Sequence, residues 1–276
     1  MATKVRVTAS RGLNVREGPG TQYRRVSALP FGTVVTVLQR SGVWGKIQTP
    51  AGWIHLGYTE PVEDEPPADG FWLDGEEAID LSLWNKLAPD FWRGAKPWAL
   101  ILKATQGLTI LDPRFGERWA RARFQAWSVW AYHFYDPSYP GYAQAGKFLR
   151  VTGLQDGERA ALDLEWYPPE GKQAWAAREV REWIRAVEDV TGKPPVIYTR
   201  RDVWVAFFGE DGDADISQRC PLVWVADYRE GVTMPLSVPG WDKPAMWQYT
   251  CTARWPGVAG NVDRSKIARW FAEQEG

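Results

Sequence analysis

The pattern of hydrophobic and polar positions divides the chain into two regions. In the first region, short runs of β-branched and aromatic residues are separated by Gly and Pro. The strands predicted there are Lys4–Ala9, Val34–Leu38, Trp44–Gln48 and Trp53–Leu56. Short strands at this spacing are typical of a small all-β barrel.

The second region alternates strand-like and helix-like stretches. The strands predicted are Ala78–Leu81, Ala99–Thr105, Ser128–Tyr135, Ala160–Trp166, Pro195–Thr199, Leu222–Tyr228, Ala245–Thr250 and Gly260–Asp263. Helical periodicity is found at Pro113–Phe124, Gly141–Leu149 and Trp175–Val190. This α/β alternation predicts a (β/α) barrel of the TIM type. Because the last three strands have little helix between them, we expect the barrel to close irregularly.

A short acidic segment separates the two regions. Residues 60–70 read EPVEDEPPADG, with five acids, three prolines and no base. Low hydrophobicity, like charge and Pro predict an extended linker. We therefore expect a β-module at 1–59, an acidic Pro-rich linker at 60–70 and a barrel at 71–276.

The net charge of −1 conceals an asymmetry between these regions. Residues 1–59 hold eight bases and one acid, a balance of +7, so the remainder carries −8. A basic module beside an acidic one indicates that the first region meets an anionic surface. The alternative is a solvated basic face with no partner. No apolar run approaches the length of a membrane span, so membrane insertion is not expected.

Polar residues recur near the C-terminal ends of the predicted barrel strands. They are Asp80, Lys103, Thr105, Tyr132, His133, Asp163, Glu165, Asp227, Trp247, Gln248, Tyr249 and Asp263. In a parallel barrel these ends converge on one face, which is where such enzymes hold their active sites. The pattern therefore predicts an active site at that face.

Asp163 and Glu165 form the most specific element of this pattern. They lie two residues apart on a predicted strand, so both point to one face and Leu164 to the other. Neighbouring carboxylates in a partly dry pocket repel, so one tends to keep its proton near neutral pH, as glycosidic bond cleavage requires. The alternative is a pair of strand-end acids in salt bridges with Arg. Asp80 and Asp263 favour catalysis, because both should reach the same mouth.

The aromatic residues indicate a sugar substrate. The chain contains 18 Trp, and most of them are expected in the core. An aromatic ring packs against the apolar face of a sugar while polar neighbours bind its hydroxyls. The aromatic residues expected near the mouth are Tyr132, Tyr198, Trp224, Trp247 and Tyr249. His133 has three alternative roles, as a ligand, a base or a core residue, and its position on a buried strand favours a core or hydrogen-bonding role.

Metal sites are not expected. The acidic segment Asp211–Asp215 lacks the Gly and Glu of a calcium loop at Ile216 and Leu222, which predicts a solvated loop instead. Cys220 and Cys251 are predicted to be free thiols at opposite ends of the barrel. With only two His in the chain, a zinc site and other metal or cofactor sites are not predicted either.

Seven segments of the second region, in order, resemble the signatures of glycoside hydrolase family 25. They are Ala78–Ser82, Leu102–Gly107, Ala131–Phe134, Leu162–Glu165, Trp224–Tyr228, Trp247–Tyr249 and Gly260–Asp263. The first region is similar to bacterial SH3-like domains, which usually bind cell walls. The segments that carry this second resemblance are Val7–Ser10, Gly12–Gly20, Gly32–Leu38 and Gly52–Ile54.

The first resemblance implies a lysozyme that cleaves the β-1,4 bond between N-acetylmuramic acid and N-acetylglucosamine of peptidoglycan. It implies that Glu165 is the general acid, that Asp163 orients the neighbouring acetamido group, and that Asp80 and Asp263 tune the cluster. The chemistry that the resemblance implies is retention by substrate assistance, with attack by an aspartate in place of the acetamide as the alternative. The candidate substrate-binding residues are Tyr132, His133, Tyr198, Trp224, Asp227, Trp247 and Gln248.

Several alternatives to this function remain at the level of sequence. The family commonly has Glu at the position of Gln106, and this change is the one hint of a non-catalytic wall-binding protein. Nucleic-acid binding is disfavoured, because the basic residues of the first region lack the aromatic interleaving of a stacking surface. The start of the sequence shows no signal peptide, so we expect synthesis in a host cytoplasm. A monomeric phage endolysin, acting on peptidoglycan and anionic wall polymers after release, fits this reading, with a bacterial autolysin as the alternative.

Overall fold

The computed structural model describes residues 3–61 and 70–275, so most of the predicted linker lies outside the described residues. The chain divides into two units, Met1–Pro66 and Pro67–Gly276.

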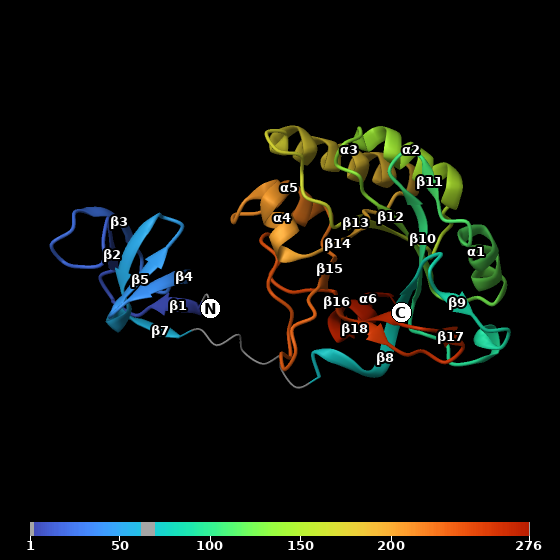
Figure 1. The fold of residues 1–276 in the computed structure, drawn as a ribbon, viewed down its shortest axis with the longest axis horizontal. Helices are drawn as coiled ribbons and strands as arrows, with labels where there is room; N and C mark the ends of the chain where they lie inside the picture. Colours follow the sequence, from blue (N-terminus) through green and yellow to red (C-terminus); the bar gives the residue numbers. More distant parts are fainter. Residues whose placement is uncertain (1–2, 62–69, 276) are drawn as a thin grey trace. The chain divides into compact units, whose positions relative to one another are not determined.

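The first unit is a sheet of seven antiparallel strands (Figure 1). The strands are β1 (Thr3–Val7), β2 (Leu13–Arg16), β3 (Arg25–Leu29), β4 (Val34–Ser41), β5 (Trp44–Ile47), β6 (Gly52–His55) and β7 (Thr59–Pro61), in the order β3-β2-β6-β5-β4-β1-β7. Alternate apolar side chains such as Val15, Val37 and Ile54 form its core. The pattern located β1, β4, β5 and β6 but missed the other three strands, because polar residues interrupt the apolar positions of β2 and β3, and β7 is only three residues long.

The second unit contains a closed eight-stranded barrel, as the sequence predicts. Its strands are β8 (Trp72–Leu81), β10 (Leu100–Gln106), β12 (Val129–Phe134), β13 (Arg159–Leu164), β14 (Val196–Thr199), β15 (Val223–Ala226), β16 (Met246–Ala253) and β18 (Val262–Ala268). Neighbours from β8 through β16 pair in parallel, and β8 also pairs with β18, which closes the barrel.

The closure is irregular because of the direction of its last strand. β18 runs antiparallel to both β16 and β8, and within the described part of the chain no helix separates β15, β16 and β18. The expected eighth strand at Gly260–Asp263 was therefore wrong in extent and direction. Asp263 lies near the start of β18, and the reversal of that strand places its start beside the C-terminal ends of the others.

Helices cover much of the outside of the barrel (Figure 1). They are α1 (Phe115–Phe124), α2 (Gly141–Thr152), α3 (Gln173–Thr191), α4 (Arg201–Phe208) and α5 (Ala214–Arg219), while α6 (Arg269–Glu275) packs its Phe271 against the barrel interior. The first three match the predicted helices. The solvated loop expected at Asp211–Asp215 needs correction, since Asp213 is buried and its carboxylate caps α5 by accepting from the Ile216 N–H at 2.9 Å.

Side chains alternate along the barrel strands between two hydrophobic clusters. One cluster joins residues such as Leu162 and Leu164 to helix residues such as Trp183, and so lies between the strands and the helices. The other contains Trp130, on the opposite face of its strand, together with Phe271 of α6. This second cluster fills the barrel interior, so the pocket lies at one end of it.

Two further predictions concern the cysteines and the membrane. Both cysteines are free, Cys220 buried before β15 and Cys251 exposed within β16. Cys251 therefore belongs to its strand and does not follow it. None of the helices in the two described ranges is both long and apolar enough to cross a membrane.

Candidate active site

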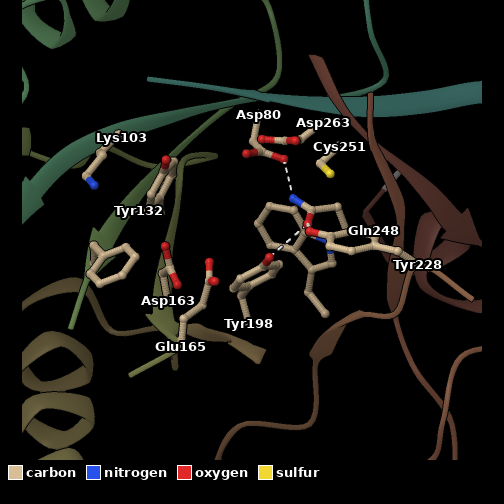
Figure 2. Close-up of a pocket in the computed structure, with 12 residues that line it drawn as sticks. Asp80, Lys103, Tyr132, Asp163, Glu165, Tyr198, Tyr228, Gln248, Cys251 and Asp263 are labelled. Carbon is tan, nitrogen blue, oxygen red and sulfur yellow. Dashed lines mark hydrogen bonds between the residues drawn. The ribbon is translucent and has the colours of Figure 1, made fainter. Parts of the chain in front are cut away.

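A cavity of about 240 Å³ opens at the carboxyl ends of the parallel strands (Figure 2). Its lining residues are Asp80, Lys103, Tyr132, Phe134, Asp163, Glu165, Tyr198, Trp224, Tyr228, Gln248, Cys251 and Asp263. All four carboxylates predicted as catalytic are among them. Figure 2 shows Asp163 and Glu165 on one side of the cavity, facing Asp80 and Asp263 on the other.

Asp80 and Asp263 form the first pair of acids. Asp80 is one residue from the end of β8, and the antiparallel register places Asp263 of β18 directly opposite it. Burial, then the charge of Asp263, raises the pKa of Asp80 well above its usual range. Burial also raises the pKa of Asp263, to about 6, against the effect of a hydrogen bond with Asp80. The pair therefore tends to hold a proton between its two carboxyl groups.

Asp163 and Glu165 form the second pair. Asp163 lies on β13 and Glu165 directly follows it, so the two-residue spacing turns both side chains into the cavity. Burial and the neighbouring Glu165 raise the pKa of Asp163 well above its usual range, while Lys103 opposes this. The Oδ1 atom of Asp163 is buried and has no hydrogen-bond partner among the described residues. A buried acceptor of this kind is poised to meet a polar group of a ligand.

A hydrogen-bond network ties the first pair to the cavity wall. Gln248 donates from Nε2 to Oδ2 of Asp80 at 2.8 Å. Its Oε1 accepts hydrogen bonds from the hydroxyls of Tyr198, at 2.8 Å, and Tyr228. Because both ends of the amide are engaged, Gln248 holds Asp80 in a fixed orientation.

Aromatic rings and one cation complete the wall. Tyr198 packs edge-to-face on Trp224, with ring centroids 4.5 Å apart. The Nζ of Lys103 lies 4.5 Å from the centroid of Phe134 and donates to Oε1 of Gln106 at 2.8 Å. Burial lowers the pKa of Lys103, while the charge of Asp163 opposes this. The cation near Asp163 and Glu165 in this cavity is thus Lys103. The alternative interpretation, in which these two acids form salt bridges with arginine, required an arginine there.

Among the predicted substrate-binding residues, Tyr132, Tyr198, Trp224 and Gln248 line the cavity, but His133 does not. Its side chain is fully buried on the other face of β12, stacked on Trp183 of α3. Nδ1 lies 2.7 Å from the Thr105 hydroxyl, and Nε2 lies 3.0 Å from Oε1 of Gln144. The assignment of His133 to substrate binding is therefore corrected, and the core alternative fits its surroundings.

Asp227 and Trp247 also lie outside the cavity lining. Both are buried, and the Trp247 indole donates to the backbone carbonyl of Asp227 at 2.7 Å. Although burial opposes it, hydrogen bonding by Arg229 and by the Leu236 N–H lowers the pKa of Asp227. These two residues hold the segment after β15 against β16, so their assignment to substrate binding is corrected too. Tyr249, two residues after Trp247 on β16, contacts the Trp247 ring, and its hydroxyl donates to Glu77 at 2.5 Å.

Lys103, which the sequence places at the mouth without a role, lines the cavity, and three further lining residues were absent from the prediction: Phe134, Tyr228 and Cys251. Strand alternation carried a signal for two of them. Phe134 is two residues after Tyr132, and Tyr228 falls on the same side as Trp224 when the alternation of β15 is continued.

The described residues contain no group of three or more His, Cys, Asp or Glu able to hold a metal ion.

Comparison with known proteins agrees with this architecture. Residues 79–258 match the family described as Glycosyl hydrolases family 25, and residues 11–60 match the family described as Bacterial SH3 domain. The uncharacterized protein YegX of Escherichia coli O157:H7 is 31% identical over 195 residues, which cover 68% of this chain. The chain spans 64% of the length of YegX.

Two further proteins extend the comparison. Lysozyme M1 of Streptomyces globisporus is 29% identical over 221 residues, covering 73% of this chain and 69% of its own. The crystal structure of the bacterial lysozyme from Streptomyces coelicolor superposes with a TM-score of 0.63 at 26% identity, covering 74% of this chain and 99% of its own. The family match spans more than half of the chain and includes three of the four cavity carboxylates. The chain belongs to glycosyl hydrolases family 25.

Proposed function

We propose that the barrel hydrolyses the β-1,4 bond between N-acetylmuramic acid and N-acetylglucosamine in bacterial peptidoglycan. The observation that carries this proposal is the gathering of four carboxylates, as two facing pairs, in one cavity with aromatic walls. Glycosidic bond cleavage needs a protonated acid near an ionised one, and two carboxyl groups lie close together on each side of this cavity. The similarity to lysozyme M1 supports the same substrate class.

Glu165 is proposed as the general acid. It is less buried than Asp163, and it faces the open cavity where a glycosidic oxygen would lie. Its proton passes to the leaving oxygen as the bond from that oxygen to the anomeric carbon breaks. Asp163, with its unpartnered Oδ1, is placed to receive the N–H of the substrate's acetamido group and orient its oxygen toward the anomeric carbon. The acetamido oxygen bonds to the anomeric carbon as the leaving oxygen departs, which gives a cyclic intermediate. Water, which loses a proton to the now ionised Glu165, then attacks the anomeric carbon and breaks its bond to the acetamido oxygen, with net retention.

The remaining cavity residues are proposed to hold the sugar. Tyr132, Tyr198 and Trp224 present rings to the cavity, and such rings pack against the C–H face of a sugar. Asp80, held by Gln248, and Asp263 accept hydrogen bonds from sugar hydroxyls and keep the local field negative. A negative field favours the positive charge that develops at the anomeric carbon in the transition state.

The test compares Glu165→Gln with the wild type on purified peptidoglycan. Loss of the acid should lower the rate by about 10²–10⁴-fold with the fold intact. Glu117→Gln, an exposed substitution on α1 that removes the same charge, should leave the rate unchanged. Mass spectrometry of the products should find muramic acid at the new reducing ends. Equal rates for Glu165→Gln and wild type, or glucosamine at those ends, would overturn the proposal.

The biological role proposed for this activity is bacterial lysis by a phage endolysin. The support is the combination of a family 25 barrel with a bacterial SH3 unit in one chain. An adjacent gene for a membrane-pore protein is expected in the genome of origin. A gene neighbourhood devoted to cell-wall growth would instead indicate an autolysin.

A further inference from the structure

The outer face of the first unit carries a row of cations around one tryptophan. In the antiparallel register, Lys46 of β5 lies opposite Trp53 of β6, and Trp53 lies opposite Arg16 of β2. Arg16 in turn lies opposite Arg25 of β3. We call Lys46, Trp53, Arg16 and Arg25 the basic row. Residues directly opposite one another share a face of the sheet, so the four side chains form a line across four strands.

The basic row lies on the face away from the core. Val15, Ile47 and Ile54, the strand neighbours of three of its members, are buried in the core of the unit. Strand alternation therefore turns the row outward. Lys46 and Arg25 are exposed, and Trp53 and Arg16 are half-buried. Arg16 donates to the Tyr23 carbonyl at 2.8 Å, which leaves the rest of its guanidinium directed to the surface.

An aromatic ladder adjoins the row. Trp44 of β5 lies opposite His55 of β6, with ring centroids 5.1 Å apart. His55 continues the ladder to the exposed ring of Tyr58 at 5.2 Å. The outer face thus alternates cations with aromatic rings. The interleaving that the sequence was expected to lack is formed between strands, where the linear order of residues does not show it.

Carboxylates within the described part of this unit do not neutralise the row. Those carboxylates are Glu17 and Glu60. Glu17 is paired with Arg24 at 2.5 Å, and Glu60 is paired with Arg6 at 3.4 Å near the far edge of the sheet. The positive charge of the basic row therefore remains available to an anionic partner.

We propose that the basic row binds a phosphate-bearing wall glycopolymer, with a sugar ring stacked on Trp53 and flanking phosphates paired with Lys46, Arg16 and Arg25. Arginine forks and lysine ammonium groups suit phosphate, and an indole suits the apolar face of a sugar. The choice of the cell wall as the source rests on the proposed function of the barrel. Single-stranded nucleic acid shares the need for cations and rings, and it enters the experiment as a competitor.

The experiment measures binding of the full chain carrying Glu165→Gln, so that the walls are not digested. One sample is a Gram-positive wall that carries glycosylated poly(ribitol phosphate), and the other is the same wall after the polymer has been removed with acid. Binding should be strong to the first wall and lost from the second, and it should fall as salt rises. Soluble glycosylated poly(ribitol phosphate) should compete better than polyphosphate of equal charge, and oligodeoxythymidine should compete poorly.

Two double variants test the location of the site. Arg25→Gln with Lys46→Gln should weaken binding about tenfold or more, since each removes one phosphate contact. Arg11→Gln with Arg40→Gln removes the same charge elsewhere. Arg40 lies opposite Gly45. A Cβ on Gly45 would contact the core residue Val37, so position 45 faces the core. Arg40 shares that face and therefore points away from the basic row. This control should bind as the parent does. A third variant, Trp53→Tyr, keeps a ring and should retain most binding, whereas Trp53→Ala should lose it.

The outcomes separate this inference from the proposed function. Equal loss in both double variants, equal binding to both walls, or stronger competition by oligodeoxythymidine would overturn the inference. Hydrolysis of glycan strands without the polymer should be the same for Arg25→Gln with Lys46→Gln as for the otherwise wild-type chain. A chain that binds the polymer but hydrolyses no strand would refute the proposed function and leave the inference standing.

Discussion

Asp80 of β8 and Asp263 of β18 lie directly opposite each other in an antiparallel pair of strands, although 182 positions separate them in the sequence. This contact exists because β18 runs against the other barrel strands. Its first residues lie at the end where the parallel strands finish. The reversal therefore adds a fourth carboxylate to a mouth that the parallel strands supply with three.

The facing pair leads to a prediction about Asp263→Asn. The charge of Asp263 is second only to burial in raising the pKa of Asp80, so its removal should lower that pKa. The Asp80 titration should therefore move to lower pH. Carbon NMR of the side-chain carboxyl groups measures this titration. Asp189→Asn, an exposed substitution on α3, should leave the titration in place. An unchanged Asp80 titration in Asp263→Asn would show that the two groups do not interact.

Asp163 leads to a prediction about stability and pH. Its pKa is raised in the folded state, so the folded protein binds this proton more tightly than the unfolded chain. The stability that this group contributes is complete below the usual value of 3.8 and is lost as pH rises through the folded pKa. Asp163→Asn removes that loss. At pH 8 the variant should therefore be more stable than the wild type.

The measurement is denaturant unfolding of wild type and Asp163→Asn at pH 4 and at pH 8. The advantage of the variant should shrink or vanish at pH 4, where the wild-type carboxyl is protonated. Asp189→Asn serves as the control and should show no such pH dependence. A variant that is less stable than wild type at pH 8 would contradict the burial effect. Because Asp163 is also proposed to act in catalysis, Asp163→Asn should lose activity while it gains stability, an exchange that is common at active sites.

His133 leads to a prediction that separates packing from substrate binding. Burial lowers the pKa of His133 to about 3, so the ring is neutral and its stabilising effect is lost as pH falls from 6.5 toward that value. His133→Phe leaves the buried Thr105 hydroxyl without its ring partner. It should lower the free energy of unfolding by about 1–3 kcal/mol at pH 8. The KM of the folded enzyme should stay unchanged, and a raised KM with unaltered stability would restore the substrate-binding role.

Much of the architecture could be predicted from the sequence because most of the parallel barrel strands, from β10 to β15, are short and mainly apolar. The direction of β18 could not be predicted. Periodicity locates a strand, but only its partners determine which way it runs, and the partners β8 and β16 come from distant parts of the chain. α4 was also missed, since its Val, Trp and Phe residues form a short, almost continuous apolar run, which a buried strand would show as well.

The candidate site was predicted with one systematic error. His133 and Trp247 each lie one position from a residue that lines the cavity, namely Tyr132 and Gln248. A shift of one residue moves a side chain to the other face of a strand. Strict alternation along β12, counted from Tyr132, would have excluded His133. The two-residue spacing of Asp163 and Glu165 predicts that both side chains lie on one face of the strand, and both line the cavity.

The contact between α2 and α3 leads to a prediction with two glycines of opposite effect. Gly141 begins α2, and a Cβ on it would lie 1.7 Å from the Glu179 carbonyl oxygen of α3. The backbone cannot approach so closely with a side chain present, so Gly141→Ala should destabilise the barrel unit by about 1–3 kcal/mol or more.

Gly146 lies in the same helix, and its nearest such neighbour is the end of the Arg150 side chain at 3.6 Å. Gly146→Ala should therefore stabilise the unit by about 0.5–1 kcal/mol, because alanine loses less backbone entropy in a helix. Denaturant unfolding followed by tryptophan fluorescence measures both variants against the wild type. Effects of the same sign in the two variants would mean that helix propensity, and not the close approach of α3, determines the residue at position 141.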